Sequence, residues 1–376
     1  MSGIYLHIPF CKQACHYCNF HFSTSLRHKE ELLGAMLLEI EQRHDYLPTT
    51  PIQSIYLGGG TPSLLNEKEL EQLFAQLHRY FRIAEDAEIT LEANPDDLTL
   101  AYLQMLRKSP VNRLSIGIQS FFDEDLQYMN RAHSAQEAYQ CLLYAQELGF
   151  SNYSIDLIYG SPTTTDAHWM ENLQKIFALK VPHISCYCLT VEPGTALDHF
   201  VKKGQALAVD EEQAARQFEQ LMAQMADQGY VHYEISNFAL PDLWARHNSN
   251  YWRGAAYLGI GPSAHSFDGK SRQWNLAHNA QYIRQVNQQG NYFEREGLSP
   301  AQQYNEYILT ALRTIWGCQW PKLKTWSPQI QNHFLEKVGP FLQDATIVEQ
   351  AGIYTLSTKG KLLADRIAME LFFEEA

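Results

Sequence analysis

The sequence lacks the features that mark several large classes of protein. Its 29 Lys and Arg residues are outnumbered by 42 Asp and Glu residues, which gives a net charge of −13, and no run of basic residues offsets that balance. A surface that follows the phosphates of a nucleic acid is therefore not expected. The N-terminus has no basic segment before an apolar run, and no stretch reaches the roughly 18 apolar residues of a membrane-spanning helix. We expect a cytoplasmic chain without nucleic acid as a partner.

Cysteine is scarce and unevenly placed, which excludes a disulfide framework. The chain has seven cysteines, an odd number; Cys11, Cys15 and Cys18 stand close together and the other four are scattered. This distribution predicts a reducing compartment and one local metal site. Disorder is also excluded, because 45% of the 376 residues are hydrophobic and only 19% are charged. At roughly 100–200 residues per domain, the length suggests two or three domains.

The first half of the chain repeats one pattern, in which a short β-branched or aromatic run is followed by an amphipathic helical stretch. Two of the helices begin with capping-box spacings, Asn66 with Glu69 and Ser134 with Glu137. The alternation predicts parallel strands joined by right-handed crossovers, in an open doubly wound sheet or an incomplete barrel. Both arrangements place ligands at the carboxyl ends of the strands. The predicted strands cover residues 4–8, 54–57, 89–92, 113–117, 153–158 and 184–189.

The pattern changes after residue 189. We expect a long polar helix over 210–228, an aromatic-rich and loop-like stretch over 230–274, and helices over 279–289 and 300–315. The tail from residue 328 predicts a helix, a strand over 353–356 and a helix over 358–373, which would suit a winged-helix-like unit. The expected α/β chain thus has a barrel domain over 1–200, a middle region associated with substrate over 201–295, and a mainly helical, winged-helix-like C-terminal domain over 296–376.

The strongest chemical signal is the spacing Cys11-x3-Cys15-x2-Cys18 in the loop after the first strand. Thiolates are ligands for iron–sulfur clusters and for zinc. Structural zinc takes four protein ligands, and His16 or His21 could complete a Cys3His site. A [4Fe–4S] cluster on three cysteines instead leaves one iron open to a ligand that is not protein. The spacing alone leaves both alternatives open.

The cysteine loop, with Tyr17 before its third cysteine, resembles that of the radical S-adenosylmethionine (SAM) superfamily. The flanking Tyr5-Leu6-His7-Ile8-Pro9-Phe10 is similar to the branch that holds the oxygen-independent coproporphyrinogen III oxidases and the HemW haem chaperones. The resemblance covers most of the chain to about residue 280 and is looser beyond it. It implies a partial (β/α)6 barrel, a [4Fe–4S] cluster on the three cysteines, and SAM on the open iron, where one electron breaks the sulfonium bond to give a 5′-deoxyadenosyl radical.

Glycine and polar residues at the ends of the predicted strands agree with this resemblance. The run Gly58-Gly59-Gly60-Thr61-Pro62 would let backbone groups approach a ligand, although alone it could be a flexible turn. Taken singly, Glu92 or Asp156 could be a helix cap and Arg131 a surface cation. The residues for which the resemblance implies contact with SAM are Tyr5, Gly59, Gly60, Thr61, Glu92, Gln119, Arg131 and Asp156.

A second motif, His247-Asn248-x2-Tyr251-Trp252, lies beyond the predicted barrel. A single histidine among aromatic residues is more often hydrogen-bonded structure than a metal ligand. The pattern, however, resembles the signature that separates HemW haem chaperones from the oxidases. This implies that His247 is an axial ligand of haem iron and that Tyr251 and Trp252 pack on the porphyrin. His265, in a Gly- and Pro-containing segment that also resembles this branch, is a weaker candidate.

Two departures separate the branches. The oxidases have a fourth cysteine where this chain has Phe20, and they have a sizeable segment before the first strand, which here begins three residues into the sequence. Both argue against decarboxylation. We therefore expect a HemW-like haem chaperone that passes haem to a respiratory acceptor at the inner face of the membrane, to which it would be peripheral, and that needs an electron donor. The alternatives are a coproporphyrinogen III oxidase, which forms protoporphyrinogen IX by radical oxidative decarboxylation, and a zinc-stabilised binding protein without radical chemistry.

Overall fold

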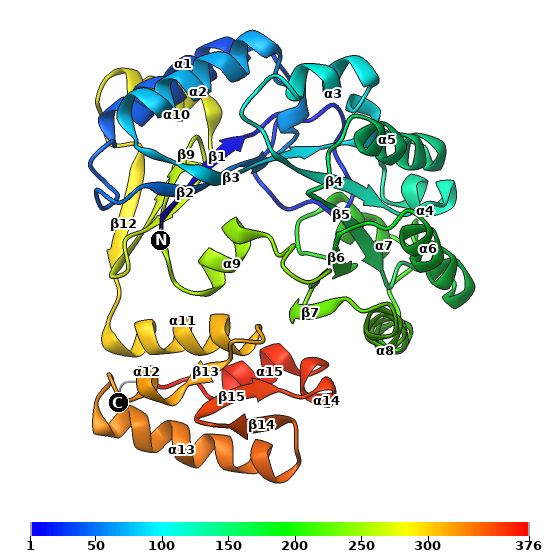
Figure 1. Ribbon diagram of the computed structural model, residues 1–376, viewed down its shortest axis with the longest axis vertical. Coiled ribbons are helices and arrows are strands. Elements are labelled where there is room, and N and C mark those ends of the chain that lie inside the picture. Colours follow the sequence, from blue (N-terminus) through cyan, green and yellow to red (C-terminus); the bar gives the residue numbers. More distant parts are fainter. Residues whose placement is uncertain (1, 375–376) are drawn as a thin grey trace.

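A curved sheet of twelve strands forms the centre of the molecule, described over residues 2–374 in a computed structural model (Figure 1). Its six central strands lie side by side in chain order and run parallel. All six predicted strands are confirmed, although the third begins earlier than expected. They are β1 (Ser2–Ile8), β2 (Ile52–Gly59), β3 (Ile83–Ala93), β4 (Arg113–Gln119), β5 (Tyr153–Tyr159) and β6 (His183–Cys188).

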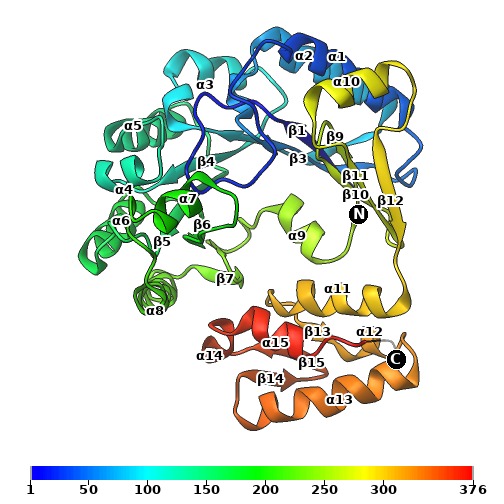
Figure 2. The same ribbon diagram turned by 180° about the vertical axis from the view of Figure 1, so that it is seen from behind.

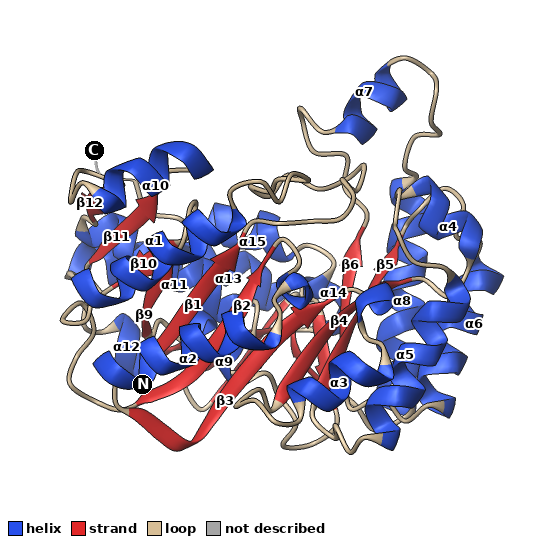
Figure 3. Ribbon diagram, turned by 90° about the horizontal axis from the view of Figure 1, so that it is seen from above, coloured by secondary structure: helices blue, strands red, loops and turns tan. Residues whose placement is uncertain are grey.

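The helices between these strands cover the convex side of the sheet (Figures 1 and 3). Both predicted capping boxes are present, at Asn66 with Glu69 and at Ser134 with Glu137. Because the strand order follows the chain order and the helices lie on one side, the sheet is an incomplete barrel and not a doubly wound sheet. The helices are α1 (Lys29–Gln42), α2 (Glu67–Tyr80), α3 (Leu100–Leu106), α4 (Asp123–Tyr128), α5 (Ala135–Glu147) and α6 (Asp166–Ala178).

The two faces of the barrel sheet differ in chemistry. Side chains alternate between the faces along each strand, and Ile4, Leu6 and Ile8 of β1 are fully buried in the main apolar core. The alternate positions carry Tyr5 on β1 and Tyr56 on β2, whose rings stack with centroids 6.1 Å apart. The concave face is therefore polar, which suits it to hold ligands.

The middle region extends this sheet at both edges. The expectation of a loop-like stretch over 230–274 is wrong for six segments: five form short strands, and residues 246–252 form a short helix. The sequence does not predict these strands, because three to five residues are too few to show an alternation of apolar and polar side chains. They also form by pairing with the open edges of β1 and β6. The added strands are β7 (Val231–Glu234), β8 (Asn237–Ala239), β9 (Ala256–Ile260), β10 (His265–Phe267), β11 (Ser271–Asn275) and β12 (Phe293–Gly297).

Four helices accompany this region. The predicted long helix is confirmed as α8 (Glu211–Asp227), capped by Asp210, and α10 (Asn279–Asn287) lies beside α1. The short helix α9 (Arg246–Trp252) lies on the concave side of the barrel (Figure 2). Figure 3 shows α7 (Ala196–Lys202) beyond the ends of β5 and β6.

The C-terminal domain has its own apolar core, formed by residues between Ala301 and Phe373. Helices surround a three-stranded sheet in the order β13-β15-β14, which agrees with the expected winged-helix-like end. Within residues 2–374, no helix has both the length and the apolar composition needed to cross a bilayer. The elements are α11 (Pro300–Leu312), β13 (Cys318–Gln319), α12 (Trp320–Leu323), α13 (Pro328–Gln343), β14 (Ile347–Gln350), β15 (Ile353–Leu356), α14 (Thr358–Lys361) and α15 (Ala364–Glu370).

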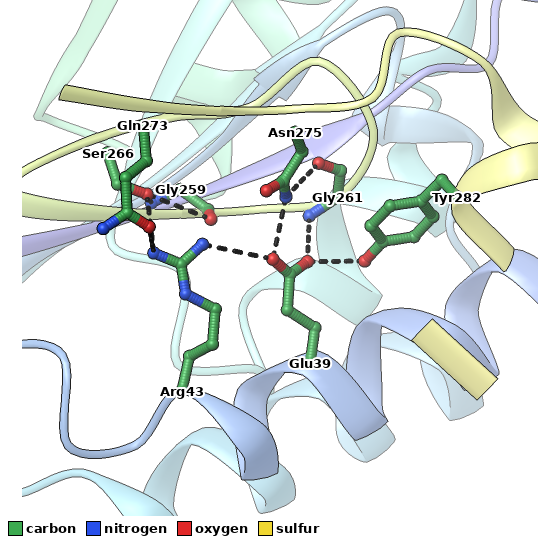
Figure 4. A network of polar contacts seen from close by, with 8 residues as sticks. All are labelled: Glu39, Arg43, Gly259, Gly261, Ser266, Gln273, Asn275 and Tyr282. Carbon is green, nitrogen blue, oxygen red and sulfur yellow. Dashed lines mark hydrogen bonds and ion pairs between the residues drawn. The ribbon is translucent and has the colours of Figure 1, made fainter. Parts of the chain in front are cut away.

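A buried carboxylate on α1 joins the added strands to the barrel (Figure 4). Glu39 is fully buried, and its oxygens accept hydrogen bonds from the backbone N–H of Gly261 at 2.8 Å, from Asn275 Nδ2 at 2.7 Å and from the hydroxyl of Tyr282 at 2.5 Å. Arg43, the residue directly after α1, lies 3.5 Å from the same carboxylate. Burial raises the pKa of Glu39. These contacts fix the strands β9 to β11 on α1.

Candidate functional site

The cysteine loop follows β1 and is tied to three neighbouring segments. The backbone N–H of Cys11 donates to Ser23 O at 3.0 Å, that of Thr61 donates to Phe10 O at 2.6 Å, and that of His16 donates to Met129 O at 3.1 Å. The loop is thereby held at the carboxyl ends of β1 and β2 and against α4. All three thiols are partly exposed. The loop therefore carries three thiols at the end of the barrel where ligands are expected, and burial raises the pKa of Cys11 to about 11 and also raises that of Cys18.

Two histidines that could complete a zinc site lie in the same loop. His16 Nδ1 hydrogen-bonds to Tyr128 O at 3.1 Å, and His21 Nε2 hydrogen-bonds to Asn279 Oδ1 at 2.7 Å. Over residues 2–374, no three His, Cys, Asp or Glu side chains converge in a metal-binding arrangement. Because a metal-bound histidine commonly hydrogen-bonds through its other ring nitrogen, these hydrogen bonds are compatible with a Cys3His site as well as with a cluster on the three cysteines.

The glycine run after β2 is required by close packing. Gly59 has a φ of +104°, and a Cβ atom on it would lie 2.5 Å from the ring of His7. A Cβ on Gly60 would lie 2.7 Å from the carbonyl oxygens of Ile8 and Phe10. No other residue fits at these two positions without displacing β1. The glycine run is thus a fixed stretch of backbone without side chains, next to the cysteine loop.

Glu92 at the end of β3 faces this edge. Its carboxylate accepts hydrogen bonds from the hydroxyl of Tyr56 at 2.8 Å and from the backbone N–H of Gly59 at 3.1 Å. Burial raises its pKa to about 7, and the nearby Asp156 contributes in the same direction. Tyr5 stacks on Tyr56 from the neighbouring strand. Glu92 is therefore a partly buried, hydrogen-bonded carboxyl group and not a helix cap.

Arg131 links β4 to the cysteine loop. Its guanidinium donates to Cys15 Sγ at 3.3 Å, to Asn94 Oδ1 at 2.7 Å and to Gly117 O at 3.0 Å, while its buried Nε has no partner within residues 2–374. This arginine is not a surface cation. It provides a fixed positive charge beside a thiol and a free donor for a further ligand.

Gln119 and Asp156 lie on the next two strands, at the end of β4 and midway along β5. Gln119 has a φ of 65° at an irregularity in the β4–β5 pairing, and it is buried. A strained non-glycine residue of this kind is common at functional sites. Asp156 lies on the concave face of β5, where burial raises its pKa to about 6. Thr61, also buried, accepts from Asn94 Nδ2 at 3.3 Å. The structure thus places six of the eight predicted SAM residues at the barrel end that carries the cysteine loop, whereas Tyr5 and Asp156 lie midway along their strands.

The second motif lies on α9, on the concave face of the sheet. His247 Nδ1 hydrogen-bonds to Ser54 Oγ at 2.9 Å, and its ring centroid lies 5.1 Å from that of Tyr56. The backbone N–H groups of Arg246 and His247 both donate to the carboxylate of Glu88 at 2.9 Å. Burial lowers the pKa of His247 to about 4, so its imidazole is neutral at neutral pH. A neutral imidazole is the form that binds iron.

The structure separates the three predicted haem residues into two environments. His247 faces β1 and β2, whereas Tyr251 and Trp252 line a cavity toward the C-terminal domain. The rings of Tyr251 and Trp252 meet edge to face, 5.1 Å apart. His265 is exposed on β10, where its ring lies 6.4 Å from Trp274. Tyr251 lies between the two environments, since it also borders the small space beside His247.

Comparison with known proteins agrees with this architecture. The radical SAM superfamily profile matches residues 5–176. The heme chaperone HemW of Bacillus subtilis is 31% identical over 371 residues, which are 98% of each chain. The HemW of Mycobacterium tuberculosis is 35% identical over 280 residues, covering 73% of this chain and 72% of that protein. The chain belongs to the HemW family. Its fold is the radical SAM fold: coproporphyrinogen III oxidase (HemN) from Escherichia coli superposes with a TM-score of 0.86 at 26% identity, over 99% of this chain and 90% of that one.

Sequence analysis missed the residues that tie the two motifs of this HemW-family chain together. Ser54 and Tyr56 on β2 contact His247, and Glu88 on β3 holds the start of α9. The alternation along β2 places Ser54, Tyr56 and Gly58 on one face, which was a usable signal. The position of α9 against these strands could not be predicted, because nothing in the sequence of residues 246–252 indicates which strands they contact.

Proposed function

We propose that this chain holds a [4Fe–4S] cluster on Cys11, Cys15 and Cys18, holds SAM at the same barrel end, and receives haem for transfer to an acceptor protein. The observation that carries the proposal is the placement of the motif on α9. A neutral His247 faces the concave side of a barrel whose carboxyl end presents three thiols. The names of the HemW relatives, which describe haem chaperones, agree with this assignment.

The residues fit a cluster with SAM. When bound, the cluster supplies the electron that cleaves the sulfonium bond of SAM. Glu92 would accept from the ammonium group of SAM, the glycine edge would leave room for its methionine end, and Arg131 would balance the negative charge of thiolate and carboxylate groups. Asp156 and Gln119 would contact the rest of the cofactor from β5 and β4.

Glu92→Gln is expected to weaken SAM binding about tenfold, because a charge-assisted hydrogen bond becomes a neutral one. The wild-type affinity should also rise with pH between 6 and 8, since the carboxyl group, with a pKa of about 7, ionises over this range and the ionised form attracts the ammonium. The affinity of the variant for SAM should depend much less on pH. Ionisation of Asp156, with a pKa of about 6, accounts for the dependence that remains. Calorimetric titration of the anaerobic, cluster-containing protein measures both effects.

Glu85→Gln is the matched control, because this exposed residue lies on the same strand. If the Glu92 variant binds SAM with the affinity and the pH dependence of the wild type, Glu92 does not contact SAM.

His247→Ala is expected to change the Soret band of the haem complex and to raise the dissociation constant for haem at least tenfold, because an axial ligand is lost. Ser54 holds Nδ1, and Nε2 has no hydrogen-bond partner within residues 2–374, which leaves Nε2 for iron. Spectrophotometric titration with haem measures the effect. The exposed His44 provides the control variant, His44→Ala. A wild-type spectrum and affinity in the His247 variant would exclude this ligand.

The acceptor in this proposal is a respiratory haem protein at the inner face of the membrane, and a separate electron donor reduces the cluster. A second function, coproporphyrinogen III oxidation, is favoured by the similarity in fold to HemN. Phe20 in place of a fourth cysteine argues against it. An anaerobic assay with reductant, SAM and coproporphyrinogen III separates the two, because sustained formation of protoporphyrinogen IX would overturn the chaperone assignment.

A further inference from the structure

Tyr56, on β2, contacts residues of both predicted sites. Its hydroxyl donates a hydrogen bond to Glu92 Oε1 at 2.8 Å, and its ring centroid lies 5.1 Å from that of His247. The side chain is buried, so water competes little for these contacts. One buried tyrosine thus joins the carboxylate proposed to bind SAM to the imidazole proposed to bind haem iron.

Close packing leaves Tyr56 little freedom to move by itself. A Cβ atom on Gly58 would lie 2.8 Å from Tyr56 Cε1 and 2.9 Å from Glu92 Oε1. The ring of Tyr5 stacks on that of Tyr56, with centroids 6.1 Å apart. Closely packed side chains transmit a displacement instead of absorbing it. A change at Glu92 is therefore expected to reach His247 through Tyr56.

Bound SAM would change the hydrogen bond at the Glu92 end of this link. Burial raises the pKa of Glu92 to about 7, so both protonation states are populated at neutral pH. The ammonium group of SAM favours the ionised carboxylate, and an ionised acceptor forms the stronger hydrogen bond with the hydroxyl of Tyr56. The ring of Tyr56 is then held more firmly against His247, whose Nδ1 is held by Ser54 at 2.9 Å. An imidazole that is ordered in advance loses less conformational entropy when it binds iron.

We propose that Tyr56 is a positioning residue that couples the two sites, so that SAM bound at Glu92 raises the affinity of the chain for haem at His247. The inference rests on the proposed function and adds regulation to it. Because coupling between two sites is reciprocal, bound haem raises the affinity for SAM by the same factor. The chain then holds haem most tightly while SAM is bound, and loss of SAM favours transfer of haem to the acceptor.

The coupling is measured as the ratio of two dissociation constants for haem, one without SAM and one with saturating SAM. The titrations use the anaerobic full chain with its cluster oxidised, because SAM is not cleaved without an electron. For the wild type, SAM should lower the dissociation constant about fivefold, at the lower end of typical couplings between sites, and should shift the Soret band of the haem complex. Haem should lower the dissociation constant for SAM by the same factor, which equilibrium dialysis measures.

Tyr56→Phe retains the ring and removes the hydroxyl, so the ratio should fall to about one and the shift of the Soret band with SAM should disappear. A uniform change in haem affinity leaves the ratio unaltered, so a purely structural effect of the substitution is not mistaken for lost coupling. Tyr153→Phe is the matched control. Tyr153 is also a buried tyrosine of the barrel sheet, but it lies in the main apolar core on the other face, with its hydroxyl bonded to Gln146 at 2.8 Å. This variant should retain the ratio of the wild type.

A second pair of variants tests the Glu92 end of the link. Glu92→Gln, saturated with SAM, should also have a ratio of about one, because its neutral amide does not respond to the ammonium group. The double variant Tyr56→Phe/Glu92→Gln should lose no further coupling, since both substitutions break the same link. Unchanged melting temperatures show that the variants are folded.

The outcomes separate this inference from the proposed function. If SAM leaves the haem affinity of the wild type unchanged or lowers it, or if Tyr56→Phe retains the ratio of Tyr153→Phe, coupling through Tyr56 is wrong and the haem chaperone proposal stands. If the wild type binds no haem or no SAM, both proposals are wrong. A ratio that is lost in Tyr56→Phe and in Glu92→Gln, and retained in Tyr153→Phe, supports the coupling.

Discussion

Replacing any one of Cys11, Cys15 and Cys18 by serine should reduce the iron content of anaerobically purified protein from about four atoms per chain to less than about one. Each thiolate holds one iron, a serine hydroxyl is a poor substitute, and the fourth iron has no protein ligand to compensate. Iron and acid-labile sulfide analyses, with the absorbance of the cluster, measure the loss. SAM binding at the open iron should be lost with the cluster.

Cys188→Ser is the matched control, because this cysteine is accessible but lies at the end of β6, outside the cysteine loop. It should retain the iron of the wild type. If the loop variants also retain it, the cluster is bound elsewhere. If wild-type protein contains one zinc and no sulfide, the zinc alternative replaces the cluster and the radical chemistry with it.

Glu39→Ala should lower the free energy of unfolding by about 3–5 kcal/mol. The substitution leaves Arg43 buried without its acidic partner, and it removes the acceptor for the N–H of Gly261, for Asn275 and for Tyr282. Buried donors without acceptors are costly. Urea unfolding or thermal melting measures the effect.

Two variants make this test specific. Glu41→Ala removes an exposed carboxylate from the same helix and should change stability by less than about 0.5 kcal/mol. Glu39→Gln retains the length of the side chain and one acceptor oxygen, so its loss should be intermediate. A Glu39→Ala variant as stable as Glu41→Ala would show that the added strands are held on the barrel by packing alone.

The barrel could be predicted because its signals are local. Each of its first six strands is a buried β-branched or aromatic run, and two of the helices carry capping boxes that the structure confirms. The short strands β7 to β12 could not be predicted. Their hydrogen-bond partners are up to about 250 residues away, and their own sequences show no clear alternation of apolar and polar residues. Tertiary pairing, and not intrinsic preference, determines their structure.

The candidate site was predictable to a similar degree. The cysteine spacing, the glycine run and the polar residues at strand ends are visible in the sequence, and the structure brings them together. The hydrogen bond between Tyr56 and Glu92, the contact of Tyr56 with His247 and the cavity lined by Tyr251 and Trp252 could not be seen in the sequence. Each depends on the distance between segments that only the folded chain brings close.

The pairing of β1 with β9 has a consequence for synthesis. One edge of the first strand is completed by β2, but the other is completed only by Ala256–Ile260, two-thirds of the way along the chain. While the polypeptide leaves the ribosome from its N-terminus, the strand that leads into Cys11 keeps an unpaired edge until β9 has emerged. Nascent chains that stop before this point expose that edge to other strands. Secure placement of the cysteine loop is therefore a late event in the maturation of this protein.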